Sequence, residues 1–459
     1  MYKINFKKPI HLHFIGIGGI SMSGLAEILL KENFCISGSD VNHSELTEKL
    51  AALGAEIFLG QRASNIREGI DAVVYTAAIH PDNPELKAAM DKQLPTLTRA
   101  ELLGQIMDNY PESIAVSGTH GKTTTTSMIT QILLNASADP TVSVGGILDS
   151  IGGNIRVGSS ELFITEACEY TDSFLNFYPK YALILNIEED HLDYFQDLAH
   201  IRRSFHEFAS NVSSDGTLIV NGEIKNFQEI TEGLSCNILT FGLASSDSYY
   251  ADNITFNTQG CANFTLMHEG NEVGPISLNV PGLHNVSNAL AACALTLEMN
   301  ISFAHIQSAL AQFRNPERRF EKKGNLGGIL IFDDYAHHPV EITATLTTAK
   351  QYENHRIVCV FQPHTYTRTK AFMDEFTTAL SLADIVVLAD IYPARETDTL
   401  GISSEDILKK LQKSGTECYY FKSFDEIENF LLNKCINGDL LITMGAGDIV
   451  QVGEHLLGK

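Results

Sequence analysis

One stretch of the sequence has the residue types that bind a phosphate group. Residues 113–129 read SIAVSGTHGKTTTTSMI, with an apolar strand-like run, two glycines (Gly118 and Gly121), a lysine and a helix-like run. A phosphate loop needs a strand that delivers the chain, glycines that bring backbone N–H groups close, and a helix N-terminus. The early glycine of the usual G-x-x-x-x-G-K-[ST] pattern is replaced by a valine. The stretch therefore predicts a shortened loop, in which Lys122 reaches the β- and γ-phosphates and the Thr123 hydroxyl binds magnesium.

A second glycine-rich turn, GIGGISMSG, occupies residues 16–24 between a strand-like and a helix-like run. The dinucleotide fingerprint G-x-G-x-x-G would place a glycine where Ser21 stands. Asp40 ends the next strand-like run, where an acidic residue can contact a ribose. The turn could therefore bind a nicotinamide cofactor or another nucleotide. Close packing of the strand against the helix is the alternative explanation of the glycines.

Acidic residues and a histidine follow two further strand-like runs. Glu166 and Glu169 come after ELFIT, and Asp190 and His191 lie in NIEEDHLD after YALIL. The carboxyl ends of parallel strands face the crevice where open α/β sheets bind ligands. These side chains could complete a magnesium shell beside the ATP phosphates, although a solvated acidic helix cap explains NIEEDHLD equally well.

Two shorter segments hold groups suited to nucleotides. Asn285 and Asn288, in VPGLHNVSNAL, could pair with an adenine edge or serve in helix capping. Arg318 and Arg319 are a local cation pair in an acidic chain, which suits a phosphate or a surface salt bridge.

Three strand-like runs near the C-terminus end in polar residues. The first leads into FDDYAHHP, the second into QPHTYTRT with Arg368, and the third into YPARE with Tyr392 and Arg395. Their shared position at strand ends predicts a pocket for a small zwitterion or a phosphate, with solvated loops as the alternative.

The elements that must position these residues alternate between strand-like and helix-like runs. This rhythm predicts parallel sheets in residues 1–104, again from SIAVSG onward, and again from about residue 330. Residues 217–280 instead hold short strand-like runs separated by Gly, Asn and Ser, which predict an antiparallel patch. We predict an α/β chain with three domains, at residues 1–104, 105–313 and 314–459.

Composition limits the class of protein. The 459 residues are 44% hydrophobic and 19% charged, and no apolar run approaches the ~18 residues of a membrane span. The eight cysteines are scattered without metal-type spacing, so we expect reduced thiols in a cytoplasmic protein. A net charge of −24 is unfavourable for nucleic-acid binding, because that affinity depends on neutralising phosphates. We expect no membrane or nucleic-acid partner, and a monomer or weak homodimer.

The motifs together resemble those of the Mur ligases, ATP-dependent enzymes that form peptide bonds in bacterial cell-wall assembly. The resemblance covers nearly the whole chain, in the order HFIGIGGISMSG, GTHGKTTTT, NIEEDHLD, HNVSNA, RRFE, DDYAHHP and QPHTYTRT. The family's own loop is the short form G-T-x-G-K-[ST]. Within the family, His120 in GTHGK and the two C-terminal segments are similar to the branch that adds L-alanine.

The resemblance implies a Rossmann-like N-terminal domain for the UDP part of UDP-N-acetylmuramate. It also implies a central P-loop ATPase domain, with a mostly parallel sheet plus the antiparallel patch, and a Rossmann-like C-terminal domain for the amino acid. The implied reaction is phosphorylation of the muramyl carboxylate by ATP, followed by attack of the L-alanine amine on the acyl phosphate. ATP and Mg²⁺ are thus the expected cofactors, and UDP-N-acetylmuramate and L-alanine the substrates.

The resemblance also implies roles for individual residues. The catalytic residues would be Lys122, His191 and Arg319. ATP would be bound by Gly118, Thr119, His120, Gly121, Lys122, Thr123, Thr124, Asn285, Asn288, Arg319 and Asp334. The UDP sugar would be bound by Gly16, Gly18, Gly19, Ser21, Asp40 and Thr76. The amino acid would be bound by Tyr335, His337 and Arg368, and the metal by Thr123, Glu166 and His191.

Some positions depart from the family pattern, and two alternatives stay open. Thr365 stands where many members have arginine, so Arg368 would carry more of the carboxylate recognition. Ile20-Ser21 replaces a smaller Ala-Gly pair, which affects the approach of the diphosphate. The first alternative is the recycling ligase that attaches a tripeptide to the same nucleotide sugar. The second is a nucleotide-binding protein without catalysis.

Overall fold

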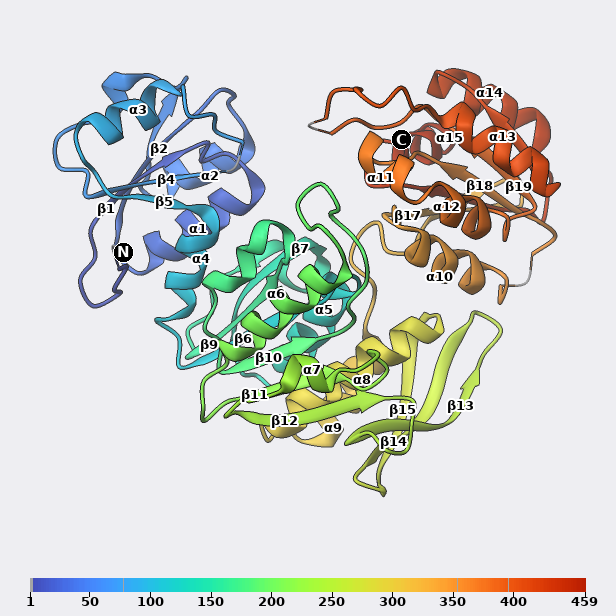
Figure 1. Cartoon of the computed structure of the whole chain (residues 1–459), viewed down its shortest axis with the longest axis horizontal. Coiled ribbons are helices and arrows are strands. Elements are labelled where there is room, and N and C mark those ends of the chain that lie inside the picture. The colour runs from blue at the N-terminus through green and yellow to red at the C-terminus, as the bar shows by residue number, and fades with distance from the viewer. Residues whose placement is uncertain (1–2, 77, 353, 395) are drawn as a thin grey trace. The chain divides into compact units, whose positions relative to one another are not determined.

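The computed structural model describes residues 3–76, 78–352, 354–394 and 396–459 (Figure 1). These residues form two compact units. The first unit consists of Met1–Gly118, Leu133–Leu185 and Arg202–Leu239, and the second of Thr119–Ile132, Asn186–Ile201 and Thr240–Lys459.

The first unit begins with a five-stranded parallel sheet in the order β3-β2-β1-β4-β5. The central strand β1, HLHFI, is buried from Leu12 to Ile15, as expected for a parallel strand covered on both faces. Its residue Leu12 lies opposite Ile36 on one side and Ala72 on the other. The strands are β1 (His11–Ile15), β2 (Cys35–Asp40), β3 (Glu56–Leu59), β4 (Ala72–Tyr75) and β5 (Thr96–Thr98). The helices are α1 (Ile20–Lys31), α2 (Glu45–Ala52), η1 (Ala63–Asn65), α3 (Pro84–Asp91) and α4 (Arg99–Met107).

A second run of strands in the first unit has the order β11-β10-β6-β9-β7-β8. All neighbours in this run are parallel except β7 and β8. The strands are β6 (Glu112–Ser117), β7 (Thr141–Leu148), β8 (Gly153–Arg156), β9 (Leu162–Ala167), β10 (Tyr181–Ile184) and β11 (Thr217–Asn221). Short helices η2 (Asp149–Ile151), η3 (Tyr170–Asn176) and α7 (Gln228–Thr231) lie in the connections. Three elements continue from one unit into the other: α5 (Lys122–Asn135), α6 (Leu198–Ser210) and β12 (Asn237–Gly242).

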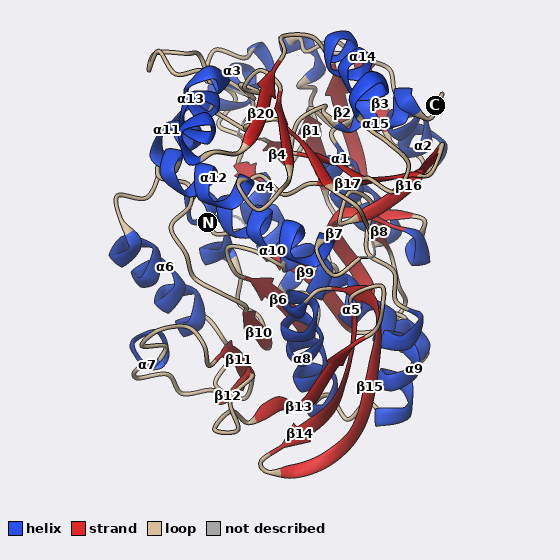
Figure 2. Cartoon of the chain, turned by 90° about the vertical axis from the view of Figure 1, so that its right-hand side faces the viewer, coloured by secondary structure: helices blue, strands red, loops and turns tan. Residues whose placement is uncertain are grey.

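In the second unit, the end of β12 pairs in parallel with β13, and β13, β14 and β15 form an antiparallel meander (Figure 2). Two helices follow the meander. The elements are β13 (Tyr249–Phe256), β14 (Cys261–His268), β15 (Asn271–Pro281), α8 (Leu283–Glu298) and α9 (Phe303–Gln312).

The C-terminal part of the second unit is a six-stranded sheet in the order β16-β17-β21-β18-β19-β20. Only β16 runs antiparallel, against β17. The strands are β16 (Glu321–Leu326), β17 (Ile329–Asp334), β18 (Ile357–Phe361), β19 (Ile385–Leu388), β20 (Glu417–Tyr420) and β21 (Leu440–Met444). The helices are α10 (Pro339–Ala349), α11 (Tyr366–Ala371), α12 (Met373–Leu380), α13 (Ser404–Ser414), α14 (Phe424–Lys434) and α15 (Val450–Leu456).

Helices cover both faces of this sheet. Alternate residues of β18 belong to two separate cores, because successive strand side chains point to opposite faces. Cys359 packs in the core that contains Leu346 of α10 and Phe376 of α12. Val360 packs in the core that contains Ile427 of α14 and Val452 of α15. This two-sided covering is typical of doubly wound α/β folds.

The structure confirms the predicted α/β class, with three alternating regions and an antiparallel patch, and refines two details. The patch is limited to β13–β15, since β11 runs parallel to β10 after the crossover through α6. The sequence reading missed β16, whose charged residues EKKGNL do not resemble a buried strand. None of the helices in the described residues combines the length and the apolar composition of a membrane span.

Candidate active site

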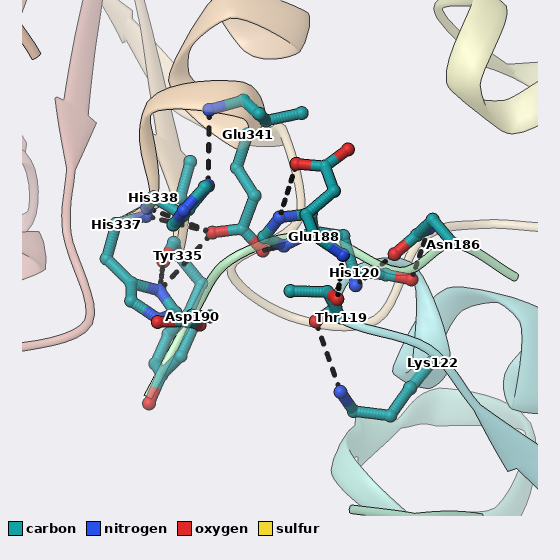
Figure 3. A network of polar contacts seen from close by, with 12 residues as sticks. Thr119, His120, Lys122, Asn186, Glu188, Asp190, Tyr335, His337, His338 and Glu341 are labelled. Carbon is teal, nitrogen blue, oxygen red and sulfur yellow. Dashed lines mark hydrogen bonds and ion pairs between the residues drawn. The ribbon is translucent and has the colours of Figure 1, made fainter. Parts of the chain in front are cut away.

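The predicted phosphate loop lies between β6 and α5. Gly118 and Gly121 have φ of +143° and +82°, a region that residues with side chains rarely adopt. The 14-residue helix α5 begins at Lys122, so the N–H groups of its first turn lie at the loop. Lys122 Nζ donates a hydrogen bond to the Thr119 carbonyl at 3.1 Å (Figure 3). Thr123 and Thr124 follow it and are buried, so strand end, glycines, lysine and helix start occur as the sequence predicts.

The segment after β10 holds the loop in place. The His120 N–H donates to Asn186 Oδ1 at 2.7 Å, and Asn186 Nδ2 donates back to the His120 carbonyl at 3.0 Å. The Glu188 N–H donates to Thr119 Oγ1 at 3.0 Å. Thr119 and His120, which the sequence analysis assigned to ATP, therefore also fix the loop to residues 186–188.

The His120 imidazole lies between two carboxylates (Figure 3). Its Nδ1 is 3.2 Å from Glu341 Oε1, and its Nε2 is 3.5 Å from Glu188 Oε2. Burial alone would lower the pKa of His120, but the carboxylates of Glu341 and Glu188 beside the ring raise it to about 9. His120 is therefore an imidazolium at neutral pH, and it links the phosphate loop to the start of α10.

His120, Glu188 and His338 form a group whose donor atoms all lie within 4.8 Å, close enough to hold a metal ion. Two features favour an ion-pair cluster instead. The His120 ring is paired with the carboxylates of Glu341 and Glu188, and this pairing favours a ring proton that a metal ligand would have to release. Both nitrogens of His338 are engaged, Nε2 with the Glu189 carbonyl at 3.1 Å and Nδ1 with the Val340 N–H at 3.4 Å.

The charge on His120 predicts a pH dependence of stability. Because the folded-state pKa of about 9 exceeds the ordinary 6.5, the stabilisation is complete below pH 6.5 and is lost as pH rises through 9. We expect the free energy of unfolding of the wild type, relative to His120→Asn, to fall by about 3 kcal/mol over this interval. Urea unfolding between pH 6 and 9.5 measures it, with exposed His43 replaced by Asn as the control. Equal pH slopes in wild type and His120→Asn would refute the imidazolium.

The same Glu341 carboxylate organises the turn that precedes α10. Its Oε2 accepts the N–H groups of His337 and His338 at 3.1 and 3.3 Å, which caps the helix. His337 Nδ1 is 3.0 Å from the Tyr335 carbonyl, so Nδ1–H donates and Nε2 is left as an acceptor. Burial is the main cause that lowers the pKa of His337 to about 4, so its ring is neutral. Glu341 thus connects the phosphate loop to the turn predicted for the amino acid.

The cation pair and Asp334 lie beside this turn. The guanidinium groups of Arg318 and Arg319 lie 5.0 and 5.2 Å from the centre of the Tyr335 ring. Arg318 Nε also donates to Asp333 at 2.9 Å, which gives this arginine a structural partner. Asp334 accepts the N–H groups of Phe320 and Ala336 and the Thr345 hydroxyl at 2.8–3.0 Å. Burial raises the pKa of Asp334 to about 6.

Arg368 and His191 meet at one small pocket. Arg368 Nε and Nη2 donate to Asp190 Oδ1 at 3.1 and 2.8 Å. Thr365, the position that departs from the family pattern, caps α11 by accepting the Arg368 N–H at 3.4 Å. The pocket is lined by Asp190, His191, Leu192, Asp193, Thr365, Thr367, Arg368, Ala371 and Phe372. Arg395, also predicted for this region, lies outside the described residues.

The predicted adenine-contacting residues lie at the start of α8. Asn285 and Asn288 are buried, whereas His284 beside them is exposed. Asn288 Oδ1 accepts from Thr125 of α5 at 3.2 Å, and its Nδ2 donates to Asn285 Oδ1 at 3.1 Å. The two amides therefore join α8 to the phosphate-loop helix, and the adenine contact stays a prediction.

The predicted UDP-sugar residues lie in the first unit. Asp40 accepts the N–H groups of Gly18 and Asn42 at 2.9 and 3.1 Å, so it holds the glycine turn. A Cβ at Gly18 would lie 2.8 Å from this carboxylate, which explains the glycine. The remaining predicted residues occupy this turn, the exposed first turn of α1 and the end of β4: Gly16, Gly19, Ser21 and Thr76.

Three family models match the chain in sequence order. They are described as Mur ligase family, catalytic domain (residues 11–111), Mur ligase middle domain (116–296) and Mur ligase, glutamate ligase domain (318–447). A relative from Agathobacter rectalis, named UDP-N-acetylmuramate–L-alanine ligase, is 60% identical over 459 residues and the full length of both chains. A solved UDP-N-acetylmuramate-alanine ligase from Thermotoga maritima is similar with a TM-score of 0.80 and 30% identity, over 98% of each chain. A murein peptide ligase from Psychrobacter arcticus is similar with a TM-score of 0.71 and 26% identity, also over 98% of each chain.

Proposed function

The chain belongs to the Mur ligase family, and we propose that it joins L-alanine to the muramyl carboxylate of UDP-N-acetylmuramate with ATP as phosphoryl donor. The observation that carries this proposal is the 60% identity, over the full length, with a relative whose name states the two joined substrates. The site supports it, because the phosphate loop is connected through His120 and Glu341 to the turn predicted to bind the amino acid.

The chain's own groups fit the two steps of this reaction. Lys122 lies at the loop, where a cation neutralises the charge that develops on the transferring phosphoryl group. Neutral His337 offers Nε2 as an acceptor for the L-alanine amine, while Arg368 offers N–H donors to its carboxylate. Residues Thr119–Ile132, which include Lys122, belong to the same unit as His337 and Arg368, so the sites proposed for the phosphoryl donor and for the amino acid lie within one unit.

We propose that the reaction uses a magnesium ion, with Thr123 and His191 of the second unit as ligands by resemblance to the family. Glu166, the third residue of that set, belongs to the first unit. Hydroxyl and carboxylate oxygens are the ligands that magnesium prefers. One oxygen of Glu166 accepts the Gly145 N–H at 2.6 Å, and the other has no hydrogen-bond partner among the described residues, so the carboxylate can take a cation. When bound, the ion would supply positive charge beside the ATP phosphates.

Two observations argue against the two rival functions. Among the solved structures, the alanine-adding ligase from Thermotoga maritima is more similar, with a TM-score of 0.80 and 30% identity, than the murein peptide ligase, with a TM-score of 0.71 and 26% identity. A protein without catalysis would not need Lys122, Thr123, Glu166 and His191 together, and all four are present. We propose further that the enzyme acts in the cytoplasm as a monomer or weak homodimer, and its eight free cysteines fit a reducing compartment.

One assay separates these functions. ADP release is measured with ATP, Mg²⁺ and UDP-N-acetylmuramate while the amino component is L-alanine, glycine, L-serine or the tripeptide. We expect kcat/KM to be highest with L-alanine, with a product heavier by one alanyl residue and no release without the UDP sugar. A preference for the tripeptide would identify the recycling ligase, and no release with any amino component would exclude a ligase.

A further inference from the structure

The guanidinium of Arg368 is fixed by two protein groups. Arg368 and Asp190 are only 9% and 7% exposed, and Nε and Nη2 of the arginine both donate to Asp190 Oδ1. The third nitrogen, Nη1, is 3.0 Å from His364 Nδ1. Burial, with the nearby His337 and Arg368, lowers the pKa of His364 to about 4, so its ring is neutral and Nδ1 can accept.

This arrangement leaves some of the N–H donors of the Arg368 guanidinium for a ligand. A guanidinium has five N–H donors, and the contacts to Asp190 and His364 use three of them within the described part of the chain. One N–H group therefore remains on each terminal nitrogen. A carboxylate can accept from both terminal nitrogens in the end-on fork of a guanidinium. The pocket lined by Arg368 and His191 lies beside this group.

Asp190 also belongs to the segment that holds the phosphate loop. Four residues earlier, Asn186 exchanges two hydrogen bonds with His120, and Glu188 donates to Thr119. A continuous set of short contacts therefore runs from the loop, through residues 186–190, to the guanidinium predicted to bind the amino acid.

We propose that Asp190 is a positioning residue, which holds the side-on edge of Arg368 so that its end-on fork binds the carboxylate of the incoming amino acid. This inference rests on the proposed function. Because Asp190 also lies in the segment bound to the phosphate loop, it sets the position of the amino-acid carboxylate relative to the transferred phosphoryl group. Neighbouring Glu189 is exposed, which makes it a matched control of equal charge.

The test compares L-alanine with L-alaninamide, which keeps the amine but lacks the carboxylate. In the wild type, kcat/KM should favour L-alanine. Asp190→Ala should lower this ratio about 10-fold, and Asp190→Asn less, since the amide oxygen still accepts from Arg368. Glu189→Gln should change the ratio less than twofold. Should the amide react too slowly, its inhibition constant against L-alanine supplies the same comparison.

Two results would overturn the proposal. An equal loss for both amines would show a general defect of the site, including any effect on neighbouring His191. A higher ratio in Asp190→Ala would show that Asp190 competes with the substrate carboxylate for Arg368. Failure of the proposed function is a separate result, because the wild type would then release no ADP with L-alanine.

Discussion

Replacing Lys122 with methionine is expected to lower kcat by about 10²-fold or more, because preorganised donors act mainly on the transition state. The lysine stands at the first residue of α5, and its ammonium group lies within 3.1 Å of the Thr119 carbonyl in the loop. Methionine keeps the length and apolar stem of the side chain but removes the charge. Steady-state kinetics with each substrate varied in turn measures the effect.

The comparison variant is Asp40→Ala in the glycine turn of the first unit. Asp40 holds the backbone of Gly18, so its loss should weaken ground-state binding of the UDP sugar and leave kcat largely unchanged. The expected effect is a higher KM for UDP-N-acetylmuramate, of about fivefold for one hydrogen bond worth roughly 1 kcal/mol. Wild-type kcat in Lys122→Met would mean that this loop is not the ATP site.

The second large effect is expected at Arg368. In Arg368→Lys a single ammonium replaces the planar fork, and it cannot contact Asp190, His364 and a substrate carboxylate with the same geometry. We expect the KM for L-alanine to rise roughly 10- to 100-fold, the range for hydrogen bonds to charged groups. The KM for ATP should change less than threefold.

The control for Arg368→Lys is Lys370→Arg, which exchanges the same two residue types at an exposed position of α11. It should leave both KM values unchanged. Equal increases in the KM for L-alanine and for ATP in Arg368→Lys would exclude a specific role in binding the amino acid.

The sequence predicted the parts of the site that depend on neighbouring residues. The glycines, lysine and helix of the phosphate loop lie within a few positions of one another, so their pattern is visible without a fold. The ribose contact of Asp40 stays a prediction, and the structure adds a contact that the spacing did not indicate, in which the Asp40 carboxylate accepts the Gly18 N–H. That contact depends on how the turn folds back on β2, which spacing does not reveal.

The residues that contact the charged and titratable side chains of the site could not be predicted in the same way. Arg368 and Asp190 are 178 residues apart in sequence, and His338 contacts a carbonyl 149 residues away. Such pairs arise only when segments far apart in the sequence come together in the folded second unit. Glu341 had a local signal, because a glutamate three residues after an N-cap position is typical of a capping box. Its pairing with His120 of the phosphate loop had no local signal.

Two buried thiols are protected from alkylation in the native state, so their labelling reports on unfolding. Cys293 in α8 and Cys359 in β18 are fully buried, and burial raises the pKa of each thiol to about 12. At pH 7 the thiolate fraction of such a group is on the order of 10⁻⁵, so alkylation in the native state is negligible. Cys35 at the start of β2 is exposed and reacts without any opening of the fold. Labelling of Cys293 and of Cys359 therefore reports separately on the opening of α8 and of the C-terminal sheet.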